Sequence, residues 1–216
     1  MNKIKEIDKI NNFLVNNTKI EFNSKNYQKI EFIYSVAIKE IKHKLEILKE
    51  EYKMFYDYDL IDHINERIKS KESITKKMTD KGIELTYSNM IKNINDIAGI
   101  RVICPLKKDI YEIRKIITNL PGIKVLKEKD YITNPKKSGY TSYHIILEVP
   151  ISLSKNSVYV KVEVQIRTMA MDFWASLEHK MKYKSKKEVK KSTSKELVEY
   201  AKIINKLDNK MMMLNN

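Results

Sequence analysis

Residues 158–167, VYVKVEVQIR, show an unbroken alternation of hydrophobic and polar positions. Every second side chain from Val158 to Ile166 is aliphatic, and the residues between them are aromatic, polar or charged. Successive side chains of a strand point to opposite faces of a sheet, so this period of two predicts a strand with one face in the core.

The other face of this strand carries Glu163, Gln165 and Arg167, and a helical pattern with the only tryptophan, Trp174, follows directly. A polar strand face is most often simply solvated. Its meaning therefore depends on whether other segments bring complementary chemistry to it.

The rest of the pattern predicts a mixture of helices and strands. Apolar residues at helical spacing predict helices over residues 26–54, 106–120, 168–182 and 195–213, a weaker helix over residues 1–20 and a short helix near Ser73. Short β-branched runs predict strands over residues 100–104, 123–132 and 143–149, and the last of these ends at Pro150 and forms a hairpin with the Val158 strand. We expect an α+β fold, with a mixed sheet of about five strands, helices packed on it and helical extensions at both ends.

The predicted elements also place Asp96 in a connection and Trp174 in a helix. Asp96 precedes a turn that contains Gly99, at the entrance of the strand over residues 100–104. The helix over residues 168–182 is expected to pack through Trp174 and Leu177.

Composition narrows the class of protein. Hydrophobic residues make up 42% of the 216 residues, which is enough for a sizeable core. The single cysteine, Cys104, cannot form an internal disulfide, and the four histidines are too scattered for a structural zinc site. No apolar run approaches the roughly 20 residues of a membrane span, so we expect a soluble, cytoplasmic protein with no membrane partner.

The net charge of +14 attracts polyanions, namely nucleic acid, anionic lipid or phosphorylated small molecules. The alternative interpretation is that lysine fills many tolerant surface positions without any partner.

Four chemically suggestive features follow one another along the chain. They are a basic helix start with Lys69, Ser73 and Lys77, an acid at a strand entrance, Asp96, a loop with Lys136, Gly139 and Tyr140, and the polar strand face with Glu163. Each alone has an ordinary explanation, such as a solvated lysine face, a turn cap or a packed tyrosine. In combination, two acids on neighbouring strands can share Mg²⁺ on a polyphosphate while cations neutralise phosphate and a tyrosine stacks on a base.

At these residues the chain resembles the RelA/SpoT family of (p)ppGpp synthetases, and among them the small alarmone synthetases. The resemblance lies in RIKSKESITKKM, DIAGIRVI, DYITNPKKSGYTSYH and EVQIRTMAMDFWASLEHKMKYK, in this order. It implies a nucleotidyltransferase-like sheet and transfer of pyrophosphate from ATP to the ribose 3′-hydroxyl of GDP or GTP, with release of AMP, in the stringent response. It also implies a division into a helical N-terminal extension (1–58), a catalytic domain (59–184) and a lysine-rich helical C-terminal extension (185–216).

The same resemblance assigns the site residues. Asp96 and Glu163 are the catalytic acids and the ligands of Mg²⁺, with Glu163 alternatively the base that takes the 3′-hydroxyl proton. The residues implied for ATP are Arg67, Lys69, Ser73, Lys77 and Arg101, and those implied for the acceptor nucleotide are Lys136, Tyr140, His144 and Gln165. A homotetramer is the implied assembly, with RNA or an allosteric nucleotide as further partners.

Three positions depart from the family pattern: Lys129 and Thr141 stand where Arg is frequent, and Asp172 stands where Asn is common. These departures bear on acceptor phosphate binding and on the choice among GDP, GTP and GMP. The pair Asp62-His63 has the reverse order of the His-Asp motif of the family's hydrolase domain and falls in an expected helical region. We therefore expect synthesis without degradation of the product.

Two other functions stay open at this point. One is an RNA- or nucleotide-binding regulator that acts through its lysines, and steep weakening of binding with salt would distinguish it from a metal-centred enzyme. The other is a different nucleotidyltransferase on a related sheet, against which the Gly139-Tyr140 loop argues.

Overall fold

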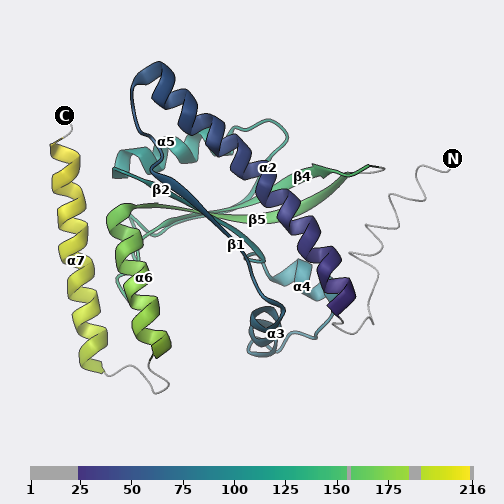
Figure 1. The fold of residues 1–216 in the computed structure, drawn as a ribbon. Helices are drawn as coiled ribbons and strands as arrows, with labels where there is room; N and C mark the ends of the chain where they lie inside the picture. The colour runs from purple at the N-terminus through teal and green to yellow at the C-terminus, as the bar shows by residue number, and fades with distance from the viewer. Residues whose placement is uncertain (1–23, 155–156, 185–190, 215–216) are drawn as a thin grey trace.

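The computed structural model describes residues 24–154, 157–184 and 191–214, so the helix expected over residues 1–20 lies outside the described part (Figure 1). The described elements are α2 (Ser24–Tyr56), β1 (His63–Ile68), α3 (Lys71–Thr79), α4 (Tyr87–Asn93), β2 (Ala98–Cys104), α5 (Lys107–Thr118), β3 (Lys124–Asp130), β4 (Tyr143–Ser152), β5 (Ser157–Thr168), α6 (Met169–Lys184) and α7 (Lys191–Met213). None of these helices is long and apolar enough to cross a membrane.

The strands form one five-stranded mixed sheet in the order β1-β2-β5-β4-β3. β2 and β5 run parallel, and the other neighbouring pairs are antiparallel. β4 and β5 form the expected hairpin, with Ser152 opposite Ser157. The expected α+β class and the mixed sheet are therefore confirmed.

The main core lies between one face of the sheet and the long helix α2, which crosses the sheet in Figure 1. The alternating side chains of β5, from Val158 to Ile166, are all buried on this face, whereas Tyr159 between them is 66% exposed. α2 buries Ile30 and Ile41 in the same cluster. Full burial of such a side chain contributes about 1.5–3 kcal/mol, so this face is fixed by its apolar residues.

The expectation of a helical region around Asp62-His63 is wrong, because β1 begins at His63. β1 is an edge strand that pairs only with β2, and none of its residues is buried. Only Ile64 and Ile68 of this strand pack against the core, and the charged Glu66 lies between them. The strand therefore lacks the apolar alternation that predicts a strand.

Two strand boundaries also differ from the sequence prediction. β4 continues through Pro150 to Ser152. Its pairing with β3 reaches only to Glu148, so one edge of β4 is free at Pro150, and the missing N–H of the proline leaves no hydrogen bond of the sheet unmade. Gly99 lies within β2 opposite Arg67 instead of in a turn.

The two helices after β5 stand side by side at one end of the sheet (Figure 1). Trp174 is buried as expected, but it belongs to a small second cluster with Ala175 and Leu197 of α7. Leu177 is 37% exposed, so the expectation that it packs inside is wrong. The residue of α6 that joins the main core is Met171.

Candidate active site

The register of the sheet places its polar residues in two rows across the face opposite the core. The first row is Arg67, Gly99, Glu163, Ile146 and Lys127, and the second is Asn65, Arg101, Gln165, His144 and Lys129. Residues directly opposite on neighbouring strands point to the same side of a sheet. Backbone pairing alone therefore brings Glu163 onto one surface with four of the residues predicted for the two nucleotides, namely Arg67, Arg101, His144 and Gln165.

Asp96 sits just before β2 and is held by two lysines. Its carboxylate accepts hydrogen bonds from Nζ of Lys69 over 2.9 Å and from Nζ of Lys77 over 2.7 Å. Lys69 is itself fixed, because its backbone N–H donates to the carbonyl of Ile97 over 2.8 Å and its carbonyl accepts from the hydroxyl of Tyr27 over 2.5 Å. Burial alone would raise the pKa of Asp96, but the two lysines outweigh it and lower the pKa to about 2.

Glu163 belongs to a closed ring of hydrogen-bonded side chains. Nη2 of Arg167 donates to the hydroxyl oxygen of Tyr140 over 2.6 Å, and this hydroxyl lies 2.7 Å from Nε2 of His144. Nδ1 of His144 lies 3.2 Å from one carboxylate oxygen of Glu163, and Nε2 of Gln165 donates to the other over 2.8 Å. Nη2 of Arg167 also donates to Oε1 of Gln165 over 2.8 Å, which closes the ring.

The chemistry of the groups fixes the direction of these hydrogen bonds. The Glu163 carboxylate only accepts, so a neutral His144 carries its proton on Nδ1 and accepts from Tyr140 at Nε2. One path then runs from Arg167 through Tyr140 and His144 to Glu163, and the other runs from Arg167 through Gln165 to Glu163. Burial alone would raise the pKa of Glu163, but the hydrogen bonds from His144 and Gln165 outweigh it, and the pKa is lowered.

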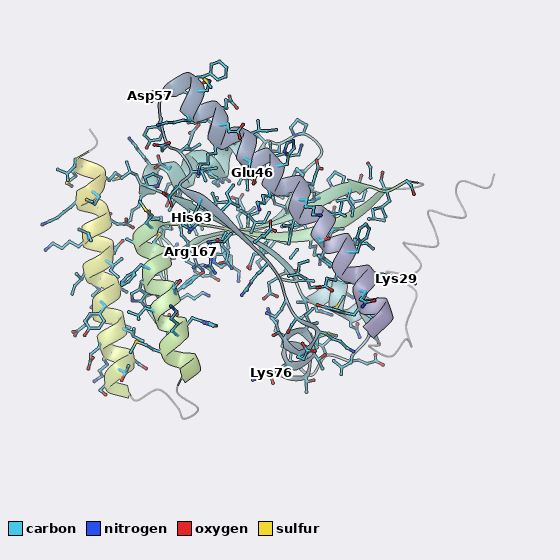
Figure 2. The ribbon with its side chains drawn as sticks, in the orientation of Figure 1. Lys29, Glu46, Asp57, His63, Lys76 and Arg167 are labelled. Carbon is cyan, nitrogen blue, oxygen red and sulfur yellow. The ribbon has the colours of Figure 1, made fainter. Side chains whose placement is uncertain are left out.

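Asp172 joins the two arginines of this face. Its Oδ1 accepts from Nη1 of Arg167 over 2.9 Å and lies 3.1 Å from Nη1 of Arg101. Arg167 is 5% exposed, and Figure 2 labels it at the end of β5, where α6 begins. The carboxylate that replaces the more usual Asn thus balances two close guanidinium groups. Nε of Arg101 is buried without a hydrogen-bond partner among the described residues.

The loop between β3 and β4 brings its lysine over two aromatic rings. Nζ of Lys136 lies 4.5 Å from the ring centre of Tyr140 and 4.6 Å from that of Tyr131. The guanidinium carbon of Arg167 lies 5.1 Å from the centre of the Tyr140 ring. Tyr140 is therefore oriented before any ligand arrives.

Two cavities on this face hold most of the predicted site residues. One of about 250 Å³ is lined by both acids together with Lys77, Lys81, Asn93, Asn95, Lys127, Lys129, Tyr131, Lys136, His144 and Ile146. The other, of about 390 Å³, is lined by Arg67, Arg101, Tyr140, Gln165, Arg167, Ala175, Ser176, Glu178, His179 and Lys180. The predicted donor and acceptor residues thus share two adjoining hollows. The exceptions are Lys69 and Ser73, which line neither cavity. Ser73 is exposed near the start of α3, where Ser70 caps the helix.

Several residues of these cavities were absent from the predicted site. Lys127 could have been found, because it precedes Lys129 by two residues and alternation places both on one strand face. Arg167, by contrast, was expected to close the end of this strand face, and it lines the second cavity. Its hydrogen bonds to Tyr140 and Gln165 depend on tertiary contacts that no local pattern reveals.

The described residues contain no group of three or more His, Cys, Asp or Glu side chains that could hold a metal ion. A metal held entirely by protein ligands is therefore not a feature of this part of the chain. Asp96 and Glu163 remain as two oxygen donors on the wall of the same cavity.

Comparisons with known proteins agree with this geometry. A family model for a region found in RelA / SpoT proteins matches residues 66–188. GTP pyrophosphokinase YwaC of Bacillus subtilis (strain 168) is 43% identical over 180 residues, which cover 83% of this chain and 86% of that protein. The crystal structure of small alarmone synthetase 1 from Bacillus subtilis bound to its product pppGpp matches with a TM-score of 0.83 and 31% identity, over 89% of this chain and 97% of that one. The same synthetase bound to AMPCPP matches with a TM-score of 0.77 and 28% identity, over 89% and 97% of the two chains.

The lowered pKa of Asp96 predicts a specific acid sensitivity. A carboxyl group whose pKa is about 2 when folded and 3.8 as a free model group stabilises the fold above pH 4 and loses this contribution as the pH falls toward 2. Between pH 6 and pH 3 the native protein should lose about 1 kcal/mol more unfolding free energy than Asp96→Asn, measured by urea denaturation. Equal losses in both proteins would show that Asp96 is not held by its lysines.

Proposed function

We infer the activity of this chain from its site and from the fact that it belongs to the RelA/SpoT family. It is a GTP pyrophosphokinase that makes the alarmone (p)ppGpp, by moving the terminal diphosphate of ATP to the ribose 3′-hydroxyl of GDP or GTP and releasing AMP. The observation that carries this conclusion is the lysine-rich cavity whose wall holds both Asp96 and Glu163. ATP and a guanine nucleotide are the substrates, which suits the pppGpp and AMPCPP found in the related structures.

The donor nucleotide is assigned to the β1, α3 and β2 side of the site. Arg67 and Arg101 lie on adjacent strands and line both the 390 Å³ cavity and a smaller one of about 130 Å³ between them. Planar guanidinium groups can stack on both faces of an adenine ring. Lys69 and Lys77 are the cations for the phosphates, and Ser73 is assigned to the same phosphates from the first turn of α3.

The acceptor nucleotide is assigned to the β3, β4 and β5 side. Tyr140 offers its ring to the guanine base, and Lys136 above that ring is placed to reach phosphate. His144 and Gln165 flank the 3′-hydroxyl while they hold Glu163. Lys127 and Lys129, which line the same cavity, add positive charge for the 5′-phosphates.

In the proposed reaction, Glu163 acts as the base for the acceptor hydroxyl. The 3′-oxygen forms a bond to the β-phosphorus of ATP, the bond from that phosphorus to the oxygen shared with the α-phosphorus breaks, and AMP leaves with the bonding electrons. The hydroxyl proton passes to Glu163. The lowered pKa keeps this carboxylate ionised at neutral pH, and its two hydrogen bonds fix its direction.

Asp96 and Glu163 are also the residues that would hold Mg²⁺. Mg²⁺ usually binds one or two carboxylates together with substrate phosphates and water, so a pair of acids beside a phosphate cavity fits it. The bound ion would neutralise charge on the phosphates. Lys69 and Lys77, which hold Asp96 in the free protein, would then turn toward the phosphates.

Three broader proposals accompany the activity. Residues 59–184 form the catalytic domain between two helical extensions, the protein acts in the cytoplasm where its substrates occur, and it serves the stringent response. RNA or an allosteric nucleotide as a further partner stays a prediction, as does the absence of product hydrolysis.

A homotetramer is proposed from the exposed apolar faces of α6 and α7. On α6 the exposed residues recur every fourth position, at Met169, Phe173, Leu177 and Met181, and on α7 they are Tyr200, Ile203, Leu207 and Met211. The two helices are neighbours in the fold, and each carries such a stripe. Exposed patches of this kind are typical of interfaces, and a second copy of the chain presents a matching one.

The role of Glu163 is tested by Glu163→Gln. Loss of the base should lower the rate of AMP release by roughly 10²- to 10⁴-fold, with little change in nucleotide binding. Glu148→Gln, which makes the same change on β4 outside both cavities, is the matched control and should keep the native rate. A Glu163→Gln rate within a few-fold of native would remove Glu163 from the mechanism.

The role of the metal is tested by chelation. Excess EDTA should stop AMP release, and added Mg²⁺ should restore it. In Asp96→Asn the Mg²⁺ concentration needed for half of the maximal rate should rise by roughly tenfold or more. Full activity in EDTA would contradict the metal assignment.

The apolar stripes are tested by light scattering of the purified protein. The native mass should be about four times the 25.6 kDa of one chain. Phe173→Asp and Leu207→Asp should each lower it, while Tyr159→Asp, which charges an equally exposed residue on β5, should not. A native protein that elutes as a monomer would contradict the proposal.

A further inference from the structure

The loop that carries Tyr140 is pressed against α7. Gly139 has a φ of +88°, and a Cβ atom at this position would lie 2.5 Å from the Cβ of Ala201 and 3.6 Å from the Cα of Val198. The first of these distances is too short for two carbon atoms, so only glycine fits there. The indole of Trp174 lies 3.6 Å from the same point, which makes Gly139 the meeting point of the loop, α6 and α7.

The side chain of Tyr140 rests on the same junction. Together with Ala201 and Ile204 it packs against the small cluster of Trp174, Ala175 and Leu197. This cluster is separate from the main core, and α7 supplies a large part of it. The aromatic ring assigned to the guanine base is therefore seated partly on the last described helix of the chain.

α7 is anchored on both sides of its contact with the loop. Toward its start, Nε1 of Trp174 donates to the carbonyl of Leu197 over 3.0 Å. Toward its end, the hydroxyl of Thr168 donates to Oδ2 of Asp208 over 2.7 Å, and Nζ of Lys107 donates to Oδ1 of Asn209 over 2.6 Å.

The anchoring groups are well enclosed. Thr168, Asp208 and Lys107 are 0%, 5% and 8% exposed. If α7 slid along its axis, these buried polar groups would lose their hydrogen-bond partners, which would cost free energy. The hydrogen bonds therefore hold α7 at one position along its axis. Ala201 and Val198 lie between the two anchor points and face Gly139. The position of α7 therefore determines how much room the loop has at Gly139.

We propose that α7 is a positioning element for the acceptor nucleotide, and that its docking sets how tightly the Tyr140 loop binds a guanine nucleotide. The region matched by the family model ends at residue 188, whereas α7 begins at Lys191, so this support lies outside the region that the family model describes. The residues assigned to ATP lie on β1, α3 and β2 and their approaches. Arg67 and Arg101 line the 390 Å³ cavity together with Tyr140, but no residue assigned to ATP belongs to the cluster on which Tyr140 rests. The inference rests on the proposed function, because it takes Tyr140 as a contact of the acceptor.

The only tryptophan of the chain provides the measurement, since Trp174 touches both the loop and α7. GDP and the ATP analogue AMPCPP are titrated separately into the full chain, with Trp174 fluorescence and calorimetry as readouts. Ala201→Leu enlarges the residue that faces Gly139 and should displace the loop. Lys107→Met is the second variant, and it releases the far anchor without touching the loop.

Both variants should raise the Kd for GDP, by roughly tenfold or more in Ala201→Leu, and leave the Kd for AMPCPP within about twofold. Ser194→Leu, a similar enlargement at an exposed position of α7, is the matched control and should change neither. Unchanged GDP affinity in both variants, or equal losses for GDP and AMPCPP, would overturn the inference. Failure of native protein to bind any guanine nucleotide would instead contradict the proposed function.

Discussion

The alternation of side chains along β5 is the constraint on which both the core and the candidate active site depend. β5 pairs with β2 on one side and β4 on the other, so its register fixes the rows on both neighbours. Val162 and Val164 are fully buried on one face, which forces Glu163 and Gln165 onto the other. A slip of one residue would exchange the two sets, and the burial of apolar side chains prevents it. The core thus determines where the Glu163 carboxylate points.

Within the site, two carboxylates are held by opposite means. Asp96 is bound by two lysine cations, which lower its pKa to about 2, whereas Glu163 is bound by an imidazole and an amide that are both oriented by Arg167. The first arrangement suits an acid that releases its lysines to the phosphates and binds a metal in their place. The second keeps one carboxylate ionised and aimed without placing a competing cation directly on it. This difference supports distinct roles for two acids in one cavity.

The sequence predicted most of the elements and much of the site, because those residues lie in strongly patterned segments. The β5 alternation located Glu163 and Gln165, and the basic helix start located Lys69 and Lys77. β1 was missed because Glu66 interrupts the two partly buried isoleucines of this edge strand, which leaves no apolar alternation. The contact between Gly139 and Ala201 joins segments about sixty positions apart, and no local pattern contains it. The ligand roles of the individual residues remain proposals that rest on this geometry and on the family resemblance.

The central claim is that two nucleotides meet on this sheet face and exchange a diphosphoryl group. The most direct measurement uses ATP labelled at its β-phosphate, together with GDP and Mg²⁺, and follows the label and the adenine product by chromatography. The label should appear in a guanosine nucleotide with a 3′-diphosphate, accompanied by an equal amount of unlabelled AMP. Formation of ADP, or label that stays with the adenine nucleotide, would contradict the claim.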